Sequence, residues 1–530
     1  MVEGPQVNVS LIDRIRAALA RPDTYSHHPA SVEIRETHIS WVFLAGERVY
    51  KLKKPLVLDF LDYGSAERRR EMCREEVRLN RRLAPDLYLG VRGVRLTDEG
   101  AELIAEDDPR AVEFVVEMCR YEERDTLAAL LERGELLAEQ VAAVGRVLAA
   151  FHATAPRAPT DRAPVLSAER RFDQNLHELL ADVEQRDEIE RIQTLERFAH
   201  AFITAHAATF GERVAEGWVR EGHGDLRTEH VLVGQAVRVV DCVEFDRSLR
   251  ELDVADDLAF LVLDLAARGG ERFAEVLVRA YRDAGGNPGD DRLIAFYATY
   301  RALVRAKVAL LRAAQLQSAS AGHGPYSAEA DDLIALAERF AWRARLPLAI
   351  VVCGAPASGK SYLARALSER SGFAHLSSDL TRKRLAGVQP TQRAGEEAYG
   401  ADWNQRTYSE LGHRAAGELR GGRGAILDAT FRHRVDRQAF ANGFGTAAPV
   451  VFIECQAPRS VLARRAARRA DDPARISDAG VGVALREQRA WEPLDEVPAS
   501  AHIATRTDRD VEQLVGDTLA LLDRRLLELA

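Results

Sequence analysis

The C-terminal half of the chain contains a run of residues whose types and spacing suit phosphate binding. The run is GAPASGKS: Gly354, Ala355, Pro356, Ala357, Ser358, Gly359, Lys360 and Ser361. Its glycines allow the backbone to curl so that N–H groups point inward at phosphate oxygens. Lys360 would then reach the β- and γ-phosphates, and Ser361 would hold Mg²⁺. The pattern predicts a nucleoside triphosphate site.

The sequence on either side of this run supports that prediction. The apolar residues 349–353 predict a buried strand, and the Ala/Leu-rich residues up to Ser371 predict a helix. Strand, glycine-rich loop and helix form the order that a phosphate-binding loop requires. We include Tyr362, the next residue, among the expected nucleotide contacts. A chance glycine-rich turn is the competing interpretation, and the flanking elements disfavour it.

A second chemical pattern lies between Gly222 and Asp246. His-Gly-Asp at 223–225 is followed by two short apolar strands, 231–233 and 237–240, and the second strand ends on Asp241. The hairpin would deliver two carboxylates to neighbouring loop positions. Phosphoryl transfer at a protein-kinase-type site needs that pair, one Asp to orient the attacking hydroxyl and one to hold Mg²⁺.

Elements that could complete such a site lie upstream. The pattern from residue 31 to 55 predicts three strands, the last two joined by a turn at 45–48, and residues 65–83 predict a charged helix that contains Glu76. Lys51 and Lys53 fall on one face of the third strand, because side chains alternate along a strand. By themselves such charged residues are usually solvated.

Residues from about 30 to 310 resemble the aminoglycoside phosphotransferase branch of the protein-kinase-like fold. HGDLRTEH resembles that family's H-G-D-x-x-x-x-N catalytic loop, and VVDCVEF resembles its metal-binding segment. The resemblance implies that Asp225 is the catalytic base and Asp241 the Mg²⁺ ligand. It also implies that Lys51 pairs with the α/β-phosphates and with Glu76. We prefer Lys51 to Lys53 because it lies nearer the turn.

Two departures from the family pattern leave a pseudokinase as an alternative. His230 stands where the family has an Asn metal ligand, and imidazole is a poor partner for Mg²⁺. No G-x-G-x-x-G motif is present, so the loop at 37–40 is expected to cover the phosphates.

Three acidic residues follow the Asp241 segment in the sequence: Asp253, Asp256 and Asp257. These could line an acceptor pocket or cap a helix.

The residues after the phosphate loop predict further strands that end on polar side chains. SGFAHLSSD would deliver Asp379, GAILDAT would deliver Asp428, and PVVFIECQA forms a fourth strand. Strands separated by helix-length connections predict a parallel sheet with ligands at the carboxyl ends. An arginine-rich helix follows, with Arg464, Arg465, Arg468, Arg469 and Arg475.

This half resembles the small P-loop kinases, the group that contains gluconate and shikimate kinases, zeta toxins and polynucleotide 5′-kinases. The resemblance implies that Asp379 engages the acceptor hydroxyl and that Asp428 lies near the metal. It also implies a lid arginine, which could be Arg464, Arg468 or Arg475. An N-cap role for Asp379 and a solvated helix face for the arginines are the alternatives.

We therefore expect two domains in the 530-residue chain. The first, 1–325, would be an α+β protein-kinase-like domain. The second, 345–530, would be an α/β P-loop kinase domain with a parallel sheet. Residues 317–344 would form a linker and a connecting helix.

Composition narrows the class of protein. The net charge of −9 argues against a dedicated nucleic-acid binder. Five scattered cysteines suggest reduced thiols in a cytoplasm. The N-terminus shows no signal pattern, and the longest apolar run, from Leu258, is too short to span a membrane. We expect a cytoplasmic protein without a membrane partner.

The predicted function is that of an ATP-dependent kinase that uses ATP and Mg²⁺ and phosphorylates a small hydroxylated acceptor. One alternative is an ATP-binding switch protein whose N-terminal pseudokinase acts as a sensor. The other is a polynucleotide 5′-hydroxyl kinase, which the acidic charge and the lack of aromatic residues among the arginines disfavour. The acceptors and the oligomeric state are left open.

Overall fold

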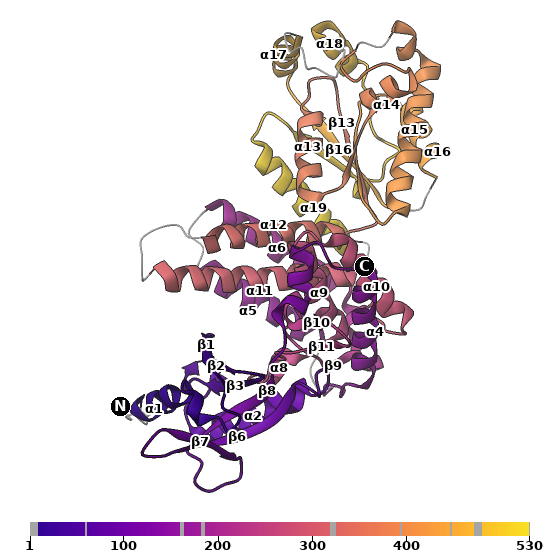
Figure 1. Ribbon diagram of the computed structural model, residues 1–530. Helices are drawn as coiled ribbons and strands as arrows, with labels where there is room; N and C mark the ends of the chain where they lie inside the picture. Colours follow the sequence, from indigo (N-terminus) through magenta and orange to yellow (C-terminus); the bar gives the residue numbers. More distant parts are fainter. Residues whose placement is uncertain are drawn as a thin grey trace. The chain divides into compact units, whose positions relative to one another are not determined.

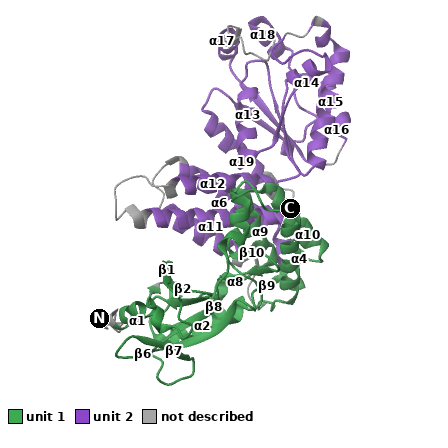
Figure 2. Cartoon of the chain, viewed as in Figure 1, with its two compact units in different colours: residues 1–161, 212–289 green, residues 162–211, 290–530 purple. Residues whose placement is uncertain are grey.

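The computed structural model consists of two compact units (Figure 2). Unit 1 comprises residues 1–161 and 212–289, and unit 2 comprises 162–211 and 290–530. The structure describes residues 9–58, 61–159, 164–181, 186–317, 325–392, 395–445, 448–470 and 480–528. Residues 318–324 of the predicted linker and Arg475 of the predicted lid therefore lie outside the described residues.

Unit 1 begins with an antiparallel sheet in the strand order β1-β2-β3-β8-β6-β7 (Figure 1). The elements of this part are α1 (Val9–Leu19), β1 (Val32–Glu36), β2 (Ser40–Ala45), β3 (Arg48–Lys53), β4 (Val57–Leu58), β5 (Leu61–Asp62), α2 (Ala66–Asn80), β6 (Tyr88–Leu96), β7 (Ala101–Ala105) and β8 (Glu113–Cys119). Apolar residues of α1 pack with one set of sheet side chains, including Phe43 and Leu52. Residues of α2 pack with the other set, including Val49 and Val116.

The rest of unit 1 is mainly helical and contains two small antiparallel sheets. Its elements are α3 (Leu127–Glu132), α4 (Ala138–Thr154), β9 (Val219–Glu221), β10 (Val231–Val233), β11 (Val237–Val239), α8 (Arg247–Arg250), β12 (Glu251–Asp253), α9 (Val254–Ala267) and α10 (Glu271–Asp283). β10 pairs with β11, and β9 pairs with β12. The helix α7 (Ala207–Glu216) contains the boundary between the units. The predicted hairpin before Asp241 is confirmed.

Unit 2 contains a group of helices and a parallel sheet. The helices are α5 (Pro164–Ala181), α6 (Arg186–Ala205), α11 (Asp291–Gln317) and α12 (Pro325–Arg343). Aromatic side chains hold this group together: Phe202 stacks on Phe296 at 4.6 Å between ring centroids, and Phe172 lies 5.4 Å from the same ring. Their grouping with the phosphate-loop region was not expected from the sequence.

The five-stranded sheet of unit 2 is parallel throughout, in the order β14-β15-β13-β16-β17. Its elements are β13 (Ala349–Cys353), α13 (Lys360–Ser371), β14 (Ala374–Ser377), α14 (Ser378–Leu385), α15 (Ala401–Arg420), β15 (Ala425–Asp428), α16 (Arg434–Phe444), β16 (Val450–Gln456), α17 (Arg459–Ala470), α18 (Val481–Arg489), β17 (His502–Arg506) and α19 (Val511–Glu528). One set of core residues packs with α13 and α19, and the other with α15 and α16. The parallel sheet predicted from the sequence is confirmed.

No helix within the described ranges is long and apolar enough to cross a membrane. All five cysteines are free, and four of them are buried.

Candidate active sites

The first site lies in unit 1, where β3 faces α2. Strand β3 pairs with β2 and β8, and its alternation sends Lys51 and Lys53 to the side of the sheet that α2 covers. Each ammonium group contacts a different carboxylate oxygen of Glu76: Lys51 Nζ lies 3.1 Å from Oε1, and Lys53 Nζ lies 2.7 Å from Oε2. One glutamate therefore serves both lysines.

The two lysines differ in their second partner and in their exposure. Lys51 also forms an ion pair with Asp241, and its side chain is 16% exposed. Lys53 lies 2.5 Å from Glu244 Oε1, and its side chain is 1% exposed. Tyr63 donates to the same Glu244 oxygen at 2.7 Å. Lys51 is thus the lysine that borders the acidic loop, whereas Lys53 is enclosed.

The charges of this cluster stabilise one another. Burial favours the neutral form of Lys51, but Asp241 and Glu76 raise its pKa well above the usual value. Burial would likewise raise the pKa of Asp241, but the Lys51 ammonium holds it well below its usual range. Both groups are therefore charged near neutral pH. Asp241 has a φ of +61°, a conformation that Asp adopts more readily than most residues.

The His-Gly-Asp loop is held by a carboxylate from α9. Asp257 accepts hydrogen bonds from the backbone N–H of His223 at 2.7 Å and of Gly224 at 3.0 Å. His152 on α4 lies 3.1 Å from the same carboxylate. We expected Asp257 to line a pocket or cap a helix; instead it fixes the loop that carries Asp225. Asp253 does cap α9, through Ala255 N–H.

His223 joins this loop to the end of β11. Its Nε2 lies 3.0 Å from the Val240 carbonyl oxygen, and its Nδ1 accepts the Asp225 N–H at 3.3 Å. Burial lowers the pKa of His223 to about 4, so the ring is neutral at physiological pH. The histidine therefore keeps Asp225 and Asp241 in register without adding charge.

Asp225 itself is paired with Arg227, two residues further on. The guanidinium Nε lies 3.0 Å from Asp225 Oδ1. Burial would raise the pKa of Asp225, but Arg227 and His230 hold it below its usual range. His230 Nδ1 lies 2.9 Å from the Asp225 carbonyl oxygen, and Arg227 donates to Nε2 at 3.3 Å. Both ring nitrogens of His230 are thus engaged within the loop.

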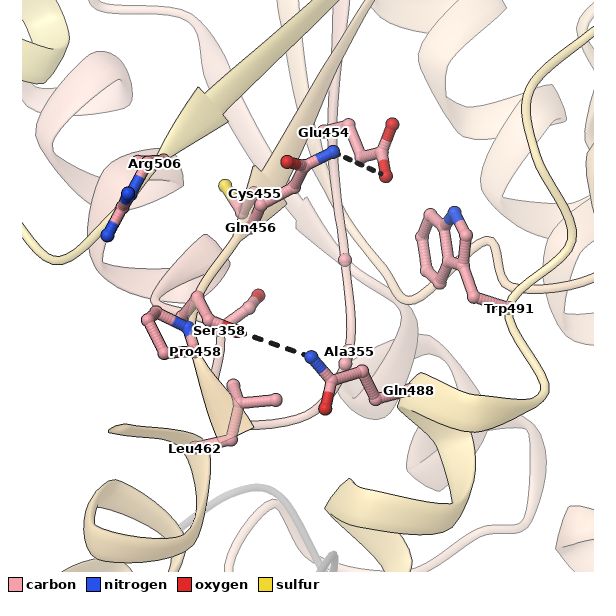
Figure 3. A pocket seen from close by; sticks show the side chains of 12 residues that line it. Ala355, Ser358, Glu454, Cys455, Gln456, Pro458, Leu462, Gln488, Trp491 and Arg506 are labelled. Carbon is pink, nitrogen blue, oxygen red and sulfur yellow. Dashed lines mark hydrogen bonds between the residues drawn. The ribbon is translucent and has the colours of Figure 1, made fainter. Parts of the chain in front are cut away.

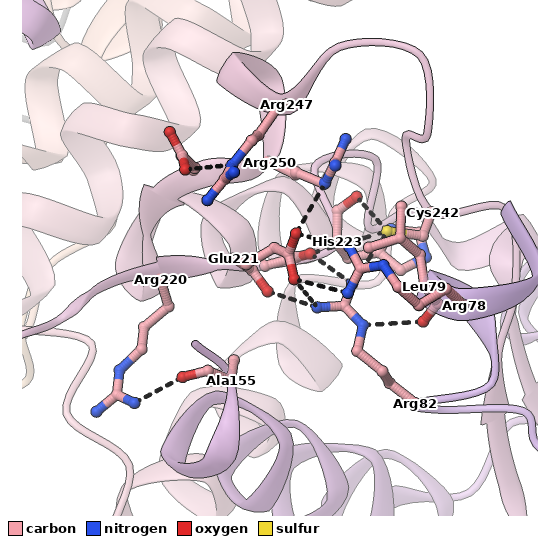
Figure 4. A network of polar contacts seen from close by, with 12 residues as sticks. Arg78, Leu79, Arg82, Ala155, Arg220, Glu221, His223, Cys242, Arg247 and Arg250 are labelled. Atoms are coloured by element: carbon pink, nitrogen blue, oxygen red, sulfur yellow. Dashed lines mark hydrogen bonds and ion pairs between the residues drawn. The ribbon is translucent and has the colours of Figure 1, made fainter. Parts of the chain in front are cut away.

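A network of arginines connects α2 to the same loops (Figure 4). Glu221 accepts from Arg78 at 2.9 Å and from Arg250 at 3.3 Å. Arg250 also lies 2.5 Å from Glu75 and donates to the carbonyls of Val243 and Glu244. Helix α2, the His-Gly-Asp loop and the Asp241 loop are therefore held as one assembly.

The predicted phosphate cover at 37–40 is a turn closed by hydrogen bonds between Thr37 and Ser40. The Thr37 hydroxyl donates to the Ser40 carbonyl at 3.1 Å and accepts the Ser40 N–H at 3.0 Å. Lys54 also holds the turn, donating from Nζ to the Thr37 carbonyl at 2.6 Å and from its backbone N–H to the Ile39 carbonyl at 2.8 Å.

The second site is the loop 354–361 in unit 2. Gly354 has a φ of +140° and Gly359 a φ of +98°, and a Cβ at Gly354 would lie 2.5 Å from the Cys455 carbonyl oxygen. Both values favour glycine. The loop is curled, Lys360 begins α13, and its side chain is largely buried. This is the conformation that the sequence predicts.

Asp428, at the end of β15, lies beside the start of α13. Burial would raise its pKa, but His375 and Lys360 hold the pKa below the usual range. The Ser361 hydroxyl also lowers the pKa of this carboxylate. Asp428 Oδ1 is buried and has no hydrogen-bond partner among the described residues. The Ser361 hydroxyl and the unpartnered Asp428 oxygen together suit Mg²⁺, which prefers oxygen ligands.

The arginine-rich helix α17 presents an unexpected residue to the loop. Arg465 donates to the Thr507 carbonyl at 2.7 Å and to the Ser358 carbonyl at 3.4 Å. Arg464 and Arg468 are exposed on the same helix. A spacing argument on helix faces could have selected Arg465, because it follows the buried Leu462 by three positions.

The remaining predicted residues differ in their surroundings. Asp379 is half-buried in the first turn of α14, and Ser377, not Asp379, is the N-cap residue. Tyr362 is 64% exposed on α13.

Comparison with known proteins gives two family matches. The model of the phosphotransferase enzyme family matches residues 45–296, and that of an AAA domain matches residues 350–494. Uncharacterized proteins of Mycobacterium tuberculosis and Mycobacterium bovis are 32% identical over 461 residues, which is 84% of this chain and 89% of theirs.

Similarities to solved structures are weaker. A choline/ethanolamine kinase family protein from Mesorhizobium loti shows a TM-score of 0.38 at 14% identity, over 62% of this chain and 94% of its own. A gluconokinase from Sinorhizobium meliloti shows a TM-score of 0.26 at 20% identity, over 34% of this chain and 94% of its own. From the family matches and the mycobacterial relatives, the chain belongs to the family of these mycobacterial proteins and carries a phosphotransferase-family domain followed by a P-loop kinase domain.

Proposed function

We propose that the protein is an ATP-dependent kinase with two nucleotide sites, each of which transfers the γ-phosphoryl group to a small hydroxylated acceptor. One observation carries the proposal: the Lys51 ammonium contacts both Glu76 and Asp241. A strand, a helix and a hairpin far apart in sequence thereby present the charges that phosphoryl transfer needs at one point.

In the N-terminal site, Asp225 would accept the proton of the acceptor hydroxyl as its oxygen bonds to the γ-phosphorus. The bond from that phosphorus to the β-γ bridging oxygen breaks, and ADP leaves with the electron pair. Asp241 would hold Mg²⁺, which supplies charge neutralisation for the phosphates. His230 is a weaker candidate ligand, because binding a metal would require it to release Arg227.

In the C-terminal site, Lys360 would contact the phosphates, and Ser361 and Asp428 would hold Mg²⁺. The unpartnered oxygen of Asp428 supports that assignment. Asp379 would orient the acceptor hydroxyl. For the arginine that stabilises transition-state charge, Arg464, Arg468 and Arg475 remain proposed candidates, and we add Arg465 because it already reaches the loop.

We further propose 1–325 and 345–530 as the two domains, with 317–344 between them. The free cysteines support a reducing, cytoplasmic location. The acidic net charge supports a small-molecule acceptor over a nucleic acid.

The test is phosphoryl transfer by wild type, Asp225→Ala, Lys360→Ala and the double variant, measured by mass gain across sugars, aminoglycosides and nucleosides. Each single variant should lose one set of products, and the double variant should lose both. Matched controls are Asp86→Asn, at an exposed ion pair with Arg238, and Lys307→Ala, paired with Glu178. Both controls should act as wild type.

Other outcomes separate the alternatives. Hydrolysis of ATP with no phosphorylated acceptor would favour the switch protein. Phosphorylation of a 5′-hydroxyl oligonucleotide with a steep salt dependence would favour the polynucleotide kinase. Wild-type activity in the double variant would overturn the proposal.

A further inference from the structure

A cavity of about 430 Å³ lies beside the phosphate loop, at the carboxyl ends of β16 and β17 (Figure 3). The loop contributes Gly354, Ala355 and Ser358 to its wall. Gln488 of α18 and the following Trp491 contribute to the opposite wall. The volume falls within the range of about 300–1,000 Å³ typical of small-molecule sites. Neither Asp379 nor Asp428 lines this cavity.

Three buried polar atoms of the lining have no hydrogen-bond partner among the described residues. They are Ser358 Oγ, Gln488 Oε1 and Trp491 Nε1. The Ser358 side chain belongs to a residue that is 1% exposed, and the Gln488 amide nitrogen is already directed at the Ala457 carbonyl, 3.3 Å away. Buried polar groups are almost always paired, and an unpaired one costs about 1–3 kcal/mol. One hydroxyl, one acceptor and one donor around a single cavity indicate a ligand that pairs with them.

Each charged residue of the lining already has a partner within the protein. Glu454 lies 2.9 Å from His502 and accepts from Gln456 at 3.2 Å. Arg506 lies 2.7 Å from Asp508. The unsatisfied groups are therefore neutral, and the Trp491 indole adds a flat apolar surface. Among the described lining residues the cation is Arg506, which already pairs with Asp508, so an anionic ligand would meet the Glu454 carboxylate with no unpaired cation beside it.

We propose that this cavity binds an uncharged, hydroxyl-rich ligand, and that the ligand and the nucleotide influence each other's affinity. The binding of the ligand is inferred from the cavity lining alone. Its influence on nucleotide affinity rests on the proposed nucleotide site. Because Gly354, Ala355 and Ser358 would border both ligands, ordering the loop for one changes the free energy of binding the other. Such coupling is reciprocal.

The experiment measures binding to the full-length protein without turnover, by isothermal titration calorimetry. The neutral probes are glycerol, D-glucose, myo-inositol and maltose; the charged probes are D-gluconate and D-glucosamine; adenosine tests for a nucleoside pocket. At least one neutral probe should bind, at least tenfold more tightly than D-gluconate or D-glucosamine. Trp491→Phe keeps an aromatic ring and removes the Nε1–H donor. Gln488→Leu removes the Oε1 acceptor. Each should weaken binding of that probe about tenfold.

Arg489→Gln is the matched control, since this exposed residue adjoins Gln488 and does not line the cavity. It should bind the probe as wild type does, and thermal melts check that all variants fold. Binding of no neutral probe, equal binding of the charged probes, or unchanged binding in both Trp491→Phe and Gln488→Leu would each overturn the proposal. Tighter binding of adenosine that both variants weaken would overturn it as well, because adenosine would then occupy this cavity.

Two measurements distinguish whether the ligand is an acceptor or an effector. If the bound probe gains one phosphoryl group, it is an acceptor; if it stays unmodified and shifts the nucleotide affinity, it is an effector. Failure of the proposed kinase activity would appear as missing phosphoryl transfer and would leave the binding result standing. A neutral probe that binds in both the presence and the absence of nucleotide with equal affinity would contradict the coupling.

Discussion

The two proposed sites differ in what would bind the phosphates of the nucleotide. In unit 2 the phosphate loop is one continuous segment. Its backbone conformation, which the positive φ values of Gly354 and Gly359 allow, would direct the N–H groups at the phosphates. In unit 1 the site is built from side-chain charges on β3, α2 and two loops, with Lys51 joining Glu76 to Asp241. A site formed by backbone conformation should be disrupted by a change in the size of one residue. A site formed by charged side chains should be disrupted by the loss of an ion pair between residues distant in sequence.

The largest contrast should come from Gly354→Ala. The new Cβ would lie 2.5 Å from the Cys455 carbonyl oxygen, so the loop must move. We expect nucleotide affinity at the C-terminal site to fall at least 100-fold, while the N-terminal site is unaffected. Titration with a nucleotide analogue in the Lys51→Ala background, which lacks the cation of the proposed N-terminal nucleotide site, measures the effect.

Gly372→Ala supplies the control for that change. Gly372 has a φ of +72° at the end of α13, but a Cβ there would meet nothing within 4 Å. It should cost about 1 kcal/mol of stability and leave nucleotide binding intact. Equal loss of nucleotide binding in Gly354→Ala and Gly372→Ala would show that nucleotide binding does not depend on the backbone conformation at Gly354.

The next contrast separates Lys51 from Lys53. Lys51→Ala removes the cation that borders the proposed nucleotide site, so we expect phosphoryl transfer at the N-terminal site to fall about 100-fold or more, a loss of about 3 kcal/mol. Lys53→Ala leaves Glu76 and Glu244 short of a buried partner. It should instead destabilise unit 1 by about 3–5 kcal/mol. Activity assays and hydrogen exchange of the β3 amides measure the two effects, and the reverse pattern would assign Lys53 to the site.

A smaller effect is expected from Asp257→Asn. The amide keeps one acceptor for the N–H groups of His223 and Gly224 but turns a donor toward the other. The loop carrying Asp225 should shift, lowering kcat at the N-terminal site about 10- to 100-fold. Activity of the C-terminal site should not change. An unaltered N-terminal kcat would remove Asp257 from the positioning role.

The last prediction concerns pH. Burial lowers the pKa of His223 to about 4, below the unfolded value of about 6.5, so the unfolded chain binds more protons between these values. The free energy of unfolding of unit 1 should therefore be highest above pH 6.5 and fall by up to about 3 kcal/mol as the pH drops towards 4. Hydrogen exchange of the β8 amides across this window measures it.

His223→Gln provides the comparison for the pH experiment, because glutamine does not titrate. The variant should be less stable at pH 7 and show a shallower pH dependence. An equal slope in both proteins would assign the titration to other groups.

Sequence determined the parts of this protein whose geometry is local. The loop 354–361 can adopt its conformation because Gly354 and Gly359 permit positive φ values within a few residues of each other, and the 231–240 hairpin follows from alternation and a short turn. The chain order of strands and helices was sufficient to predict a parallel sheet in unit 2 and an antiparallel hairpin carrying Lys51.

Tertiary structure decided what depends on which side chains meet. Lys51 and Lys53 share a strand face, and only the approach of Asp241 and Glu244 distinguishes the partly exposed Lys51 from the enclosed Lys53. Asp257 and Arg465 acquired their contacts from α9 and α17 docking on loops that lie 33 and 107 residues away in sequence. Periodicity specifies the face on which a side chain lies, and packing between distant segments specifies its partner.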